Sequence, residues 1–271
     1  MKYYDKNNTR IVEVNKGVNS AYWDKQWQSE PDVSYSKKVS PLNYVYRFTK
    51  KYCPPGSKIL EGGCGRADKV YTLHYNGYDV YGLDYAKKAI SVAHNKCPEL
   101  KLSIGDVYSL PFKTNSFDAY WSLGVIEHFI DGYKPIIEEM KRVLKKDGIL
   151  FVSVPIMSKL RIWKARNNYY PIISREESDF NKEFYQYIYH PKDLLNNYND
   201  YGFKLLEVIH IDGVKGLKDE VSSLKKVLSI IYNHPAKPVK AFKVLLDILL
   251  CFFSNHSCLF IFKNTDVGNQ F

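Results

Sequence analysis

Short apolar runs alternate with segments of helical periodicity between residues 58 and 154. The apolar runs predict strands, and the segments between them, bounded by Gly or Pro, predict helices. The predicted strands are 58–60, 78–83, 100–104, 119–122 and 149–154, and the predicted helices are 69–76, 85–97 and 135–144. Strands that alternate with helices in this way form a parallel sheet with helices on both faces, so the fold class is α/β and doubly wound.

The pattern is looser on either side of this region. Residues 156–184 are basic and aromatic without a clear period, and a further series of elements follows them. We expect an extended segment at 184–189, a helix at 191–201, strands at 203–211 and 258–262, and helices at 217–232 and 239–253. A helix is also expected to begin at Pro41, because an apolar period starts there and ends before a Pro-Pro-Gly breaker.

The first forty residues are polar and aromatic, and Tyr22, Trp23 and Trp27 form their only dense apolar cluster. We expect residues 1–40 to be a cap segment that these aromatics anchor to the domain. The alternative is that the aromatics close over a bound cofactor.

A glycine turn follows the first predicted strand, in the stretch Ile59-Leu60-Glu61-Gly62-Gly63-Cys64-Gly65. Gly63 and Gly65 remove side chains where the backbone turns sharply and a ligand comes close. A dinucleotide fingerprint would need a small residue at Asp68. The carboxylate of Glu61 would repel a pyrophosphate, whereas it would attract a cationic nucleoside without phosphate. This argues against a nicotinamide-dependent oxidoreductase, which stays as an alternative.

The stretch resembles the first motif of the class I S-adenosylmethionine-dependent methyltransferases, in which an acidic residue precedes Gly-x-Gly. Ala67 stands at the third small position, where that family usually has Gly. The resemblance implies a Rossmann-like, mostly parallel seven-stranded sheet whose last strand, at 258–262, is antiparallel. It also implies a methyltransferase domain over 41–271, with substrate-side insertions at about 156–184 and 213–256.

Asp84 ends the second predicted strand, close to the offset of about 20 residues at which an acidic side chain meets ribose hydroxyls in a βαβ unit. Capping of the following helix is the alternative role. By resemblance, Asp106 accepts from the adenine amino group and the Val107 amide reaches the ring, although an Asp after Gly is also a common turn residue. The resemblance thus assigns the cofactor S-adenosyl-L-methionine to Glu61, Gly63, Gly65, Asp84, Tyr85, Asp106, Val107, Ser122 and Leu123.

His128 follows the fourth predicted strand in a Glu-His segment like that of small-molecule methyltransferases of the quinone and glycan branches. The carboxyl ends of the strands carry the chemistry in open α/β sheets. A neutral imidazole suits a general base near pH 7, so His128 is the candidate catalytic residue. A hydrogen bond to the backbone, or a helix cap, is the alternative. We expect no metal site.

The sequence lacks two signatures of nucleic-acid methylation: an Asp/Asn-Pro-Pro-Tyr segment after the fourth strand and a Pro-Cys dipeptide. The acceptor predicted by resemblance is therefore an oxygen of a sugar, a lipid-linked intermediate or an aromatic metabolite. A non-catalytic module that keeps the fold and cofactor is the alternative, because nothing in the sequence proves turnover.

The formal net charge is +10, from Lys and Arg pairs scattered over the chain. The predicted helix 239–253 is apolar with lysines near its start, and Asp247 in its middle argues against spanning a bilayer. It could lie in a membrane interface, pack over the active site or form a homodimer contact. Five cysteines without metal or disulfide spacing, and no signal segment, predict a cytoplasmic protein with reduced thiols, peripheral to the membrane if that helix binds lipid.

Overall fold

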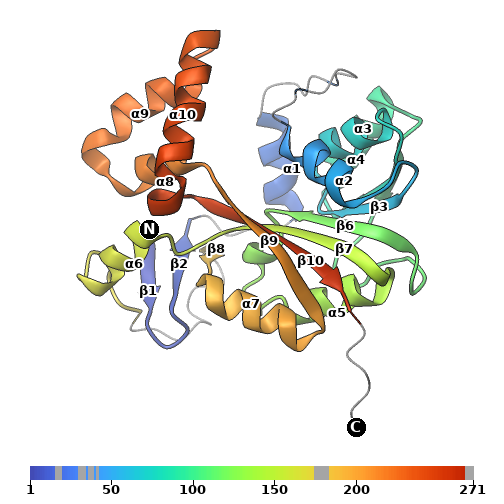
Figure 1. Ribbon diagram of the computed structural model, residues 1–271, viewed down its shortest axis with the longest axis horizontal. Helices are drawn as coiled ribbons and strands as arrows, with labels where there is room; N and C mark the ends of the chain where they lie inside the picture. The colour runs from blue at the N-terminus through green and yellow to red at the C-terminus, as the bar shows by residue number, and fades with distance from the viewer. Residues whose placement is uncertain (16–19, 30–34, 36–39, 41–42, 174–182, 266–271) are drawn as a thin grey trace.

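A seven-stranded sheet forms the centre of the molecule (Figure 1), in the order β5-β4-β3-β6-β7-β10-β9. The computed structural model describes residues 1–15, 20–29, 35, 40, 43–173 and 183–265; Pro41, where we expected a helix to begin, lies outside them. The strands are β3 (Lys58–Gly62), β4 (Asp79–Asp84), β5 (Lys101–Ile104), β6 (Phe117–Leu123), β7 (Leu144–Pro155), β9 (Phe203–Ile211) and β10 (Ser257–Asn264). Neighbours from β5 to β7 pair in parallel, and β10 runs antiparallel to β7 and β9. The predicted topology is confirmed.

The strand order reverses between β3 and β6, which lie side by side although β4 and β5 separate them in the chain. At such a reversal, the connections that leave the two strands diverge to opposite faces and open a crevice at the carboxyl ends. The sheet topology therefore places a ligand site beyond the ends of β3 and β6.

The sheet is buried on both faces because alternate side chains of each strand point in opposite directions. One face packs Ile59, Trp121 and Phe151 against α2 (Tyr44–Tyr52), α3 (Asp68–His74) and α4 (Lys87–Lys96). The other packs Leu60, Tyr120 and Val152 against α5 (Lys134–Val143) and α7 (Pro191–Asp200). The doubly wound arrangement expected from the sequence is confirmed.

A second, three-stranded antiparallel sheet packs beside the first. It pairs β1 (Lys2–Asp5) and β2 (Arg10–Val14) with β8 (Phe184–Ile188), and α6 (Lys159–Arg166) lies next to it (Figure 1). The extended segment at 184–189 was predicted, but the two N-terminal strands were not.

Three helices between β9 and β10 form what we call the helical arm, residues 213–254: α8 (Gly213–Glu220), α9 (Lys225–Asn233) and α10 (Lys237–Ser254). The prediction of one helix at 217–232 was wrong, because a 3₁₀ turn at Ser222–Leu224 divides it. The arm projects away from the main sheet (Figure 1), and its contact with the sheet includes Phe252 of α10 against His210 of β9. Because β9 runs parallel to β7, its carboxyl end lies at the same end of the strands as the crevice. The arm begins directly after that end of β9.

Candidate functional site

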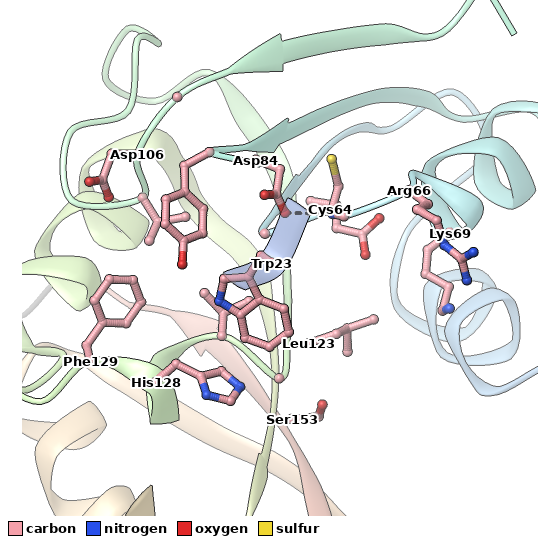
Figure 2. A pocket seen from close by; sticks show the side chains of 18 of the residues that line it. Trp23, Cys64, Arg66, Lys69, Asp84, Asp106, Leu123, His128, Phe129 and Ser153 are labelled. Carbon is pink, nitrogen blue, oxygen red and sulfur yellow. Dashed lines mark hydrogen bonds between the residues drawn. The ribbon is translucent and has the colours of Figure 1, made fainter. Parts of the chain in front are cut away.

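A cavity of about 700 Å³ opens at the carboxyl ends of the parallel strands. Its walls come from the segments after β3, β4, β5 and β6 and from α1 (Ser20–Ser29) (Figure 2). The size falls within the range of about 300–1,000 Å³ that is usual for small-molecule sites. The residues that the sequence analysis singled out meet here from four separate segments.

The glycine turn after β3 forms one wall, in a backbone conformation that needs glycine. Gly63 has φ +78° and Gly65 has φ +50°. A Cβ on Gly63 would lie 2.4 Å from a methyl carbon of Val125, and one on Gly65 would lie 2.8 Å from the Trp27 ring. The amides of Gly63 and Cys64 donate to the Leu83 carbonyl of β4 at 2.7 and 3.1 Å, which fixes the turn against the sheet.

Asp84 connects the glycine turn to the segment that follows β4. One carboxylate oxygen accepts from the Gly65 amide at 2.7 Å and the other from the Ala86 amide at 2.8 Å. Burial raises the pKa of Asp84 above its ordinary value, and these two donors oppose the shift. Each oxygen keeps a lone pair, so the carboxylate can hold the turn and still accept from a ligand. Asp84 thus both fixes the Ala86 amide just before α4 and faces the cavity.

Glu61 presents a buried carboxyl group to the cavity. Its Oε2 has no hydrogen-bond partner among the described residues. Burial raises the pKa of Glu61 well above its usual value, and the nearby charge of Asp68 adds to that shift. A buried acceptor without a partner is costly unless a donor or a cation reaches it. This carboxyl group is therefore suited to a cationic ligand.

Asp106 follows β5 and remains exposed at the cavity's edge. Its Oδ1 accepts from the Tyr108 amide at 2.9 Å, which is the turn geometry that the alternative interpretation expected. The same residue and Val107 also line the cavity, so the turn role leaves the predicted contact with a ligand open to them.

His128 ends the 3₁₀ turn η1 (Ile126–His128), and its ring faces the cavity next to Trp23 (Figure 2). The ring nitrogen Nδ1 lies 2.7 Å from the Tyr185 carbonyl oxygen. Because a carbonyl only accepts, Nδ1 must carry the proton, which leaves Nε2 with a lone pair. Burial lowers the pKa of His128 to about 4, against the opposing effect of the Tyr185 carbonyl. The imidazole is therefore neutral near pH 7.

Ser122 is the one predicted cofactor residue that does not line the cavity. Its side chain is buried in β6. Adjacent residues of a strand point to opposite faces, and here Leu123 rather than Ser122 reaches the cavity. The other predicted residues that line it are Glu61, Gly63, Gly65, Asp84, Tyr85, Asp106, Val107 and Leu123.

The aromatic part of the site was expected from the sequence only as an alternative, and its cationic part was not predicted. Trp23 and Trp27 of α1 stack at 5.8 Å and both line the cavity. The Asp24 carboxylate accepts from the Lys88 amide at 2.9 Å, which holds α1 on the start of α4. The aromatic cluster at 22–27 was the available signal, and Trp23 and Trp27 lie in the cavity wall. Arg66 and Lys69 lie together at one end (Figure 2).

Within the described ranges, no group of three or more His, Cys, Asp or Glu side chains is placed to hold a metal ion.

Comparison with known proteins matches residues 60–152 to a family described as methyltransferase domain. The demethylmenaquinone methyltransferase of Bacillus mycoides (strain KBAB4) is 35% identical over 118 residues, which cover 40% of this chain and 49% of that protein. The mouse (Mus musculus) protein named "Probable tRNA methyltransferase 9B" is 34% identical over 113 residues, 39% of this chain and 23% of that protein. The chain therefore spans about half of the length of the first and a quarter of the second.

Among solved structures, a SAM-dependent methyltransferase from Methanosarcina mazei superposes with a TM-score of 0.55 at 16% identity, covering 84% of this chain and 99% of that one. At this identity the likeness concerns the fold. With 84% of this chain covered, it extends well beyond residues 60–152.

Proposed function

Since this chain belongs to the class I S-adenosylmethionine-dependent methyltransferases, we propose that it transfers a methyl group to an oxygen of a small or medium-sized acceptor. The acceptor class is a sugar, a lipid-linked intermediate or an aromatic metabolite. One observation carries the proposal: His128 faces an aromatic-walled cavity with Nδ1 occupied by a backbone carbonyl and Nε2 available to accept a proton.

The residues present fit S-adenosylmethionine, which when bound supplies a methyl carbon made electrophilic by the adjoining sulfonium. The unpartnered Oε2 of Glu61 meets the need for an acceptor near a cation. The bare backbone of Gly63 and Gly65 allows close approach. Asp84 would hold the ribose hydroxyls, and Asp106 with the Val107 amide the adenine. Arg66 and Lys69 would face the ligand's carboxylate.

We expect Asp84→Ala to weaken S-adenosylmethionine binding by about 1–3 kcal/mol, the loss typical of hydrogen bonds to a charged group. The substitution also frees the Gly65 amide, so its effect combines ribose contacts with the shape of the turn. Titration calorimetry measures the change.

Asp79→Ala is the matched control for this substitution, because Asp79 lies at the opposite end of β4 in an exposed ion pair with Lys101. It should leave the affinity unchanged. If Asp84→Ala also bound with the parent's affinity, the ribose assignment would be wrong.

The chain's own contribution to transfer is alignment, exclusion of water and proton acceptance. Trp23 packs edge-on against His128, with ring centroids 4.9 Å apart. The Tyr185 ring also packs edge-on against His128, with centroids 5.2 Å apart. These rings shield the imidazole and fix its orientation. A hydroxyl acceptor beside Nε2 could then lose its proton as its oxygen becomes the nucleophile.

The cavity wall supports an apolar or aromatic acceptor. Its aromatic members come from α1, from the start of α2 and from the segments after β4, β5 and β6; they are Trp23, Trp27, Tyr44, Tyr85, Tyr108 and Phe129. Flat apolar groups gain both burial and ring contacts in such a wall.

The test of the proposed function is transfer of a labelled methyl group to a panel of acceptors: reduced demethylmenaquinone, simple phenols, a lipid-linked sugar and tRNA. Label recovered as an O-methyl group in any of the first three supports the proposal. Binding of S-adenosylmethionine without label in any acceptor would instead favour the non-catalytic module.

A tRNA acceptor is the second candidate, and two observations favour it. One of the relatives carries a tRNA methyltransferase name, and the net charge of +10 suits an anionic partner. Label found only in tRNA would replace the small-molecule proposal.

We place the protein in the cytoplasm as part of this proposal. All five cysteines are free thiols, and Cys53, Cys64, Cys97 and Cys258 are buried. Free buried thiols are the usual state in a reducing compartment.

A further inference from the structure

The helical arm carries a concentration of exposed apolar side chains. On α10, Ile248 is 61% exposed, Leu249 68% and Phe252 64%. The large exposed apolar side chains of the arm are Leu224, Val227, Ile230, Phe242, Val244, Leu245, Ile248, Leu249, Phe252 and Phe253. Monomeric soluble proteins rarely leave so contiguous an apolar patch, and such patches mark a binding surface.

The apolar side chains form a stripe on the face of α10 that points away from α8, and at one end of it Phe252 contacts the His210 ring of β9, with centroids 5.1 Å apart. Phe242, Leu245, Leu249 and Phe252 recur at the spacing of one helix face. The opposite face of α10 is held by α8: Asp247 accepts from the Val214 amide at 2.9 Å, and the Gly213 carbonyl accepts from the Ser254 hydroxyl at 2.9 Å. Most of the stripe is therefore left uncovered by the described residues.

Positive charge borders the stripe. Between residues 221 and 246 the sequence has no Asp or Glu and has five lysines. Lys225, Lys226, Lys237 and Lys240 are exposed, whereas Lys243 is paired with Asp247 at 2.7 Å. The surface thus combines apolar side chains with an unbalanced cationic rim.

This charge pattern distinguishes between two occupants. A second copy related by a two-fold axis would present the same patch, and so would bring the two sets of lysines toward each other. Anionic lipid headgroups complement the lysines, while the acyl boundary accepts the apolar stripe. None of the described helices is long and apolar enough to cross a bilayer. A helix that lies in the interface needs no such length.

We propose that the helical arm binds the surface of an anionic membrane, with the α10 stripe in the acyl boundary and the lysines of α9 and α10 on the headgroups. The arm leaves β9 at the same edge of the sheet as the cavity. Binding there sets the cavity's edge toward the bilayer and favours a lipid-borne acceptor. This last step rests on the proposed function.

The test is flotation of the full chain with vesicles of phosphatidylcholine alone or with phosphatidylglycerol added. The parent should float with the anionic vesicles and stay behind with the neutral ones, and salt should reduce the floated fraction. Leu249→Glu should lower the floated fraction at least tenfold, and the pair Lys225→Glu with Lys226→Glu should do the same. Val92→Glu places the same charge on an exposed apolar position of α4, outside the arm, and should float like the parent.

Two further measurements separate the outcomes. Sedimentation velocity without lipid reports oligomeric state; a parent dimer that Leu249→Glu dissociates would show that a second copy covers the stripe and would overturn the membrane proposal. Failure of the parent chain to float with anionic vesicles would also overturn the membrane proposal. Calorimetry with S-adenosylmethionine checks folding of each variant. Cofactor binding and turnover without flotation reject the arm's role alone, whereas flotation without methyl transfer rejects the proposed function alone.

Discussion

A chain carrying His128→Asn should bind S-adenosylmethionine with the parent's affinity and lose about 10²-fold in kcat, the lower end of the range for a positioned general base, because a pKa of about 4 makes the imidazole a weak base. Asn is the informative replacement. Its side-chain amide nitrogen can donate to the Tyr185 carbonyl as Nδ1 of His128 does, but the side chain has no acceptor in the place of Nε2. The substitution therefore removes proton acceptance while it keeps the contact that holds the segment.

The pH dependence gives a second measurement of the same role. Because burial lowers the pKa of His128 to about 4, the ring stays neutral where a free histidine, with a pKa of 6.5, would begin to protonate. The parent's kcat should thus show no inflection near pH 6.5 and should fall only as the pH approaches 4. An inflection near 6.5 that His128→Asn abolishes would contradict the buried, neutral imidazole.

His94→Asn serves as the control, since His94 is exposed on α4. It should leave both kcat and its pH profile unchanged. If His128→Asn turned over at the parent's rate with unchanged cofactor affinity, His128 would have no part in the chemistry, and its contact with Tyr185 would be structural.

The central sheet could be predicted from the sequence because its strands are buried on both faces. Each such strand needs a short, continuous apolar run, as in Ile149 to Val154, and the runs stand out between helices. The positions of the glycine turn and of Asp84 at the cavity were predictable for a related reason. Their roles depend on backbone conformation and on an offset within one βαβ unit, and both are local properties of the chain.

The parts that escaped prediction depend on contacts between distant segments. β2 pairs with β8, so Val12 lies opposite Tyr187 although the two residues are far apart in the sequence. The local sequence of either strand gives no indication of its partner. α6 was missed because a charged residue, Arg161, occupies its most buried position, which hides the apolar period. Arg66 and Lys69 resemble ordinary surface cations until the fold places them at one end of the cavity.

The same distant contacts make Glu220 the most sensitive position of the fold. Its carboxylate accepts from Lys2 at 2.6 Å, Arg161 at 3.0 Å, Lys164 at 2.8 Å and the Tyr170 hydroxyl at 2.5 Å. Arg161, which is fully buried, also donates to the carbonyls of Ile156 and His256, at the ends of β7 and β10. One side chain thus ties the N-terminal sheet, α6 and the helical arm to the main sheet.

We expect Glu220→Gln to lower the free energy of unfolding by about 3–5 kcal/mol near pH 7, because it leaves the buried Arg161 without its counter-charge. Burial by itself would raise the pKa of Glu220, but the charges of Lys2 and Arg161 and the hydrogen bonds from Lys164 and Lys2 outweigh it and lower the pKa to about 2. A carboxyl group with a lowered pKa stabilises the fold above its unfolded pKa, here 4.5, and loses that contribution as the pH falls toward 2. The difference between parent and variant should therefore be constant above about pH 5 and shrink between 4.5 and 2.

Urea unfolding at a series of pH values measures this difference, and Glu207→Gln provides the comparison. Glu207 also pairs with a lysine, Lys51, at 2.6 Å, but that pair is exposed, so its loss should barely move the midpoint. An equal, small effect from both substitutions would mean that the buried cations find other partners without Glu220. A large effect from Glu220→Gln that persists unchanged at pH 2 would show that hydrogen-bond geometry, rather than charge, holds these four segments together.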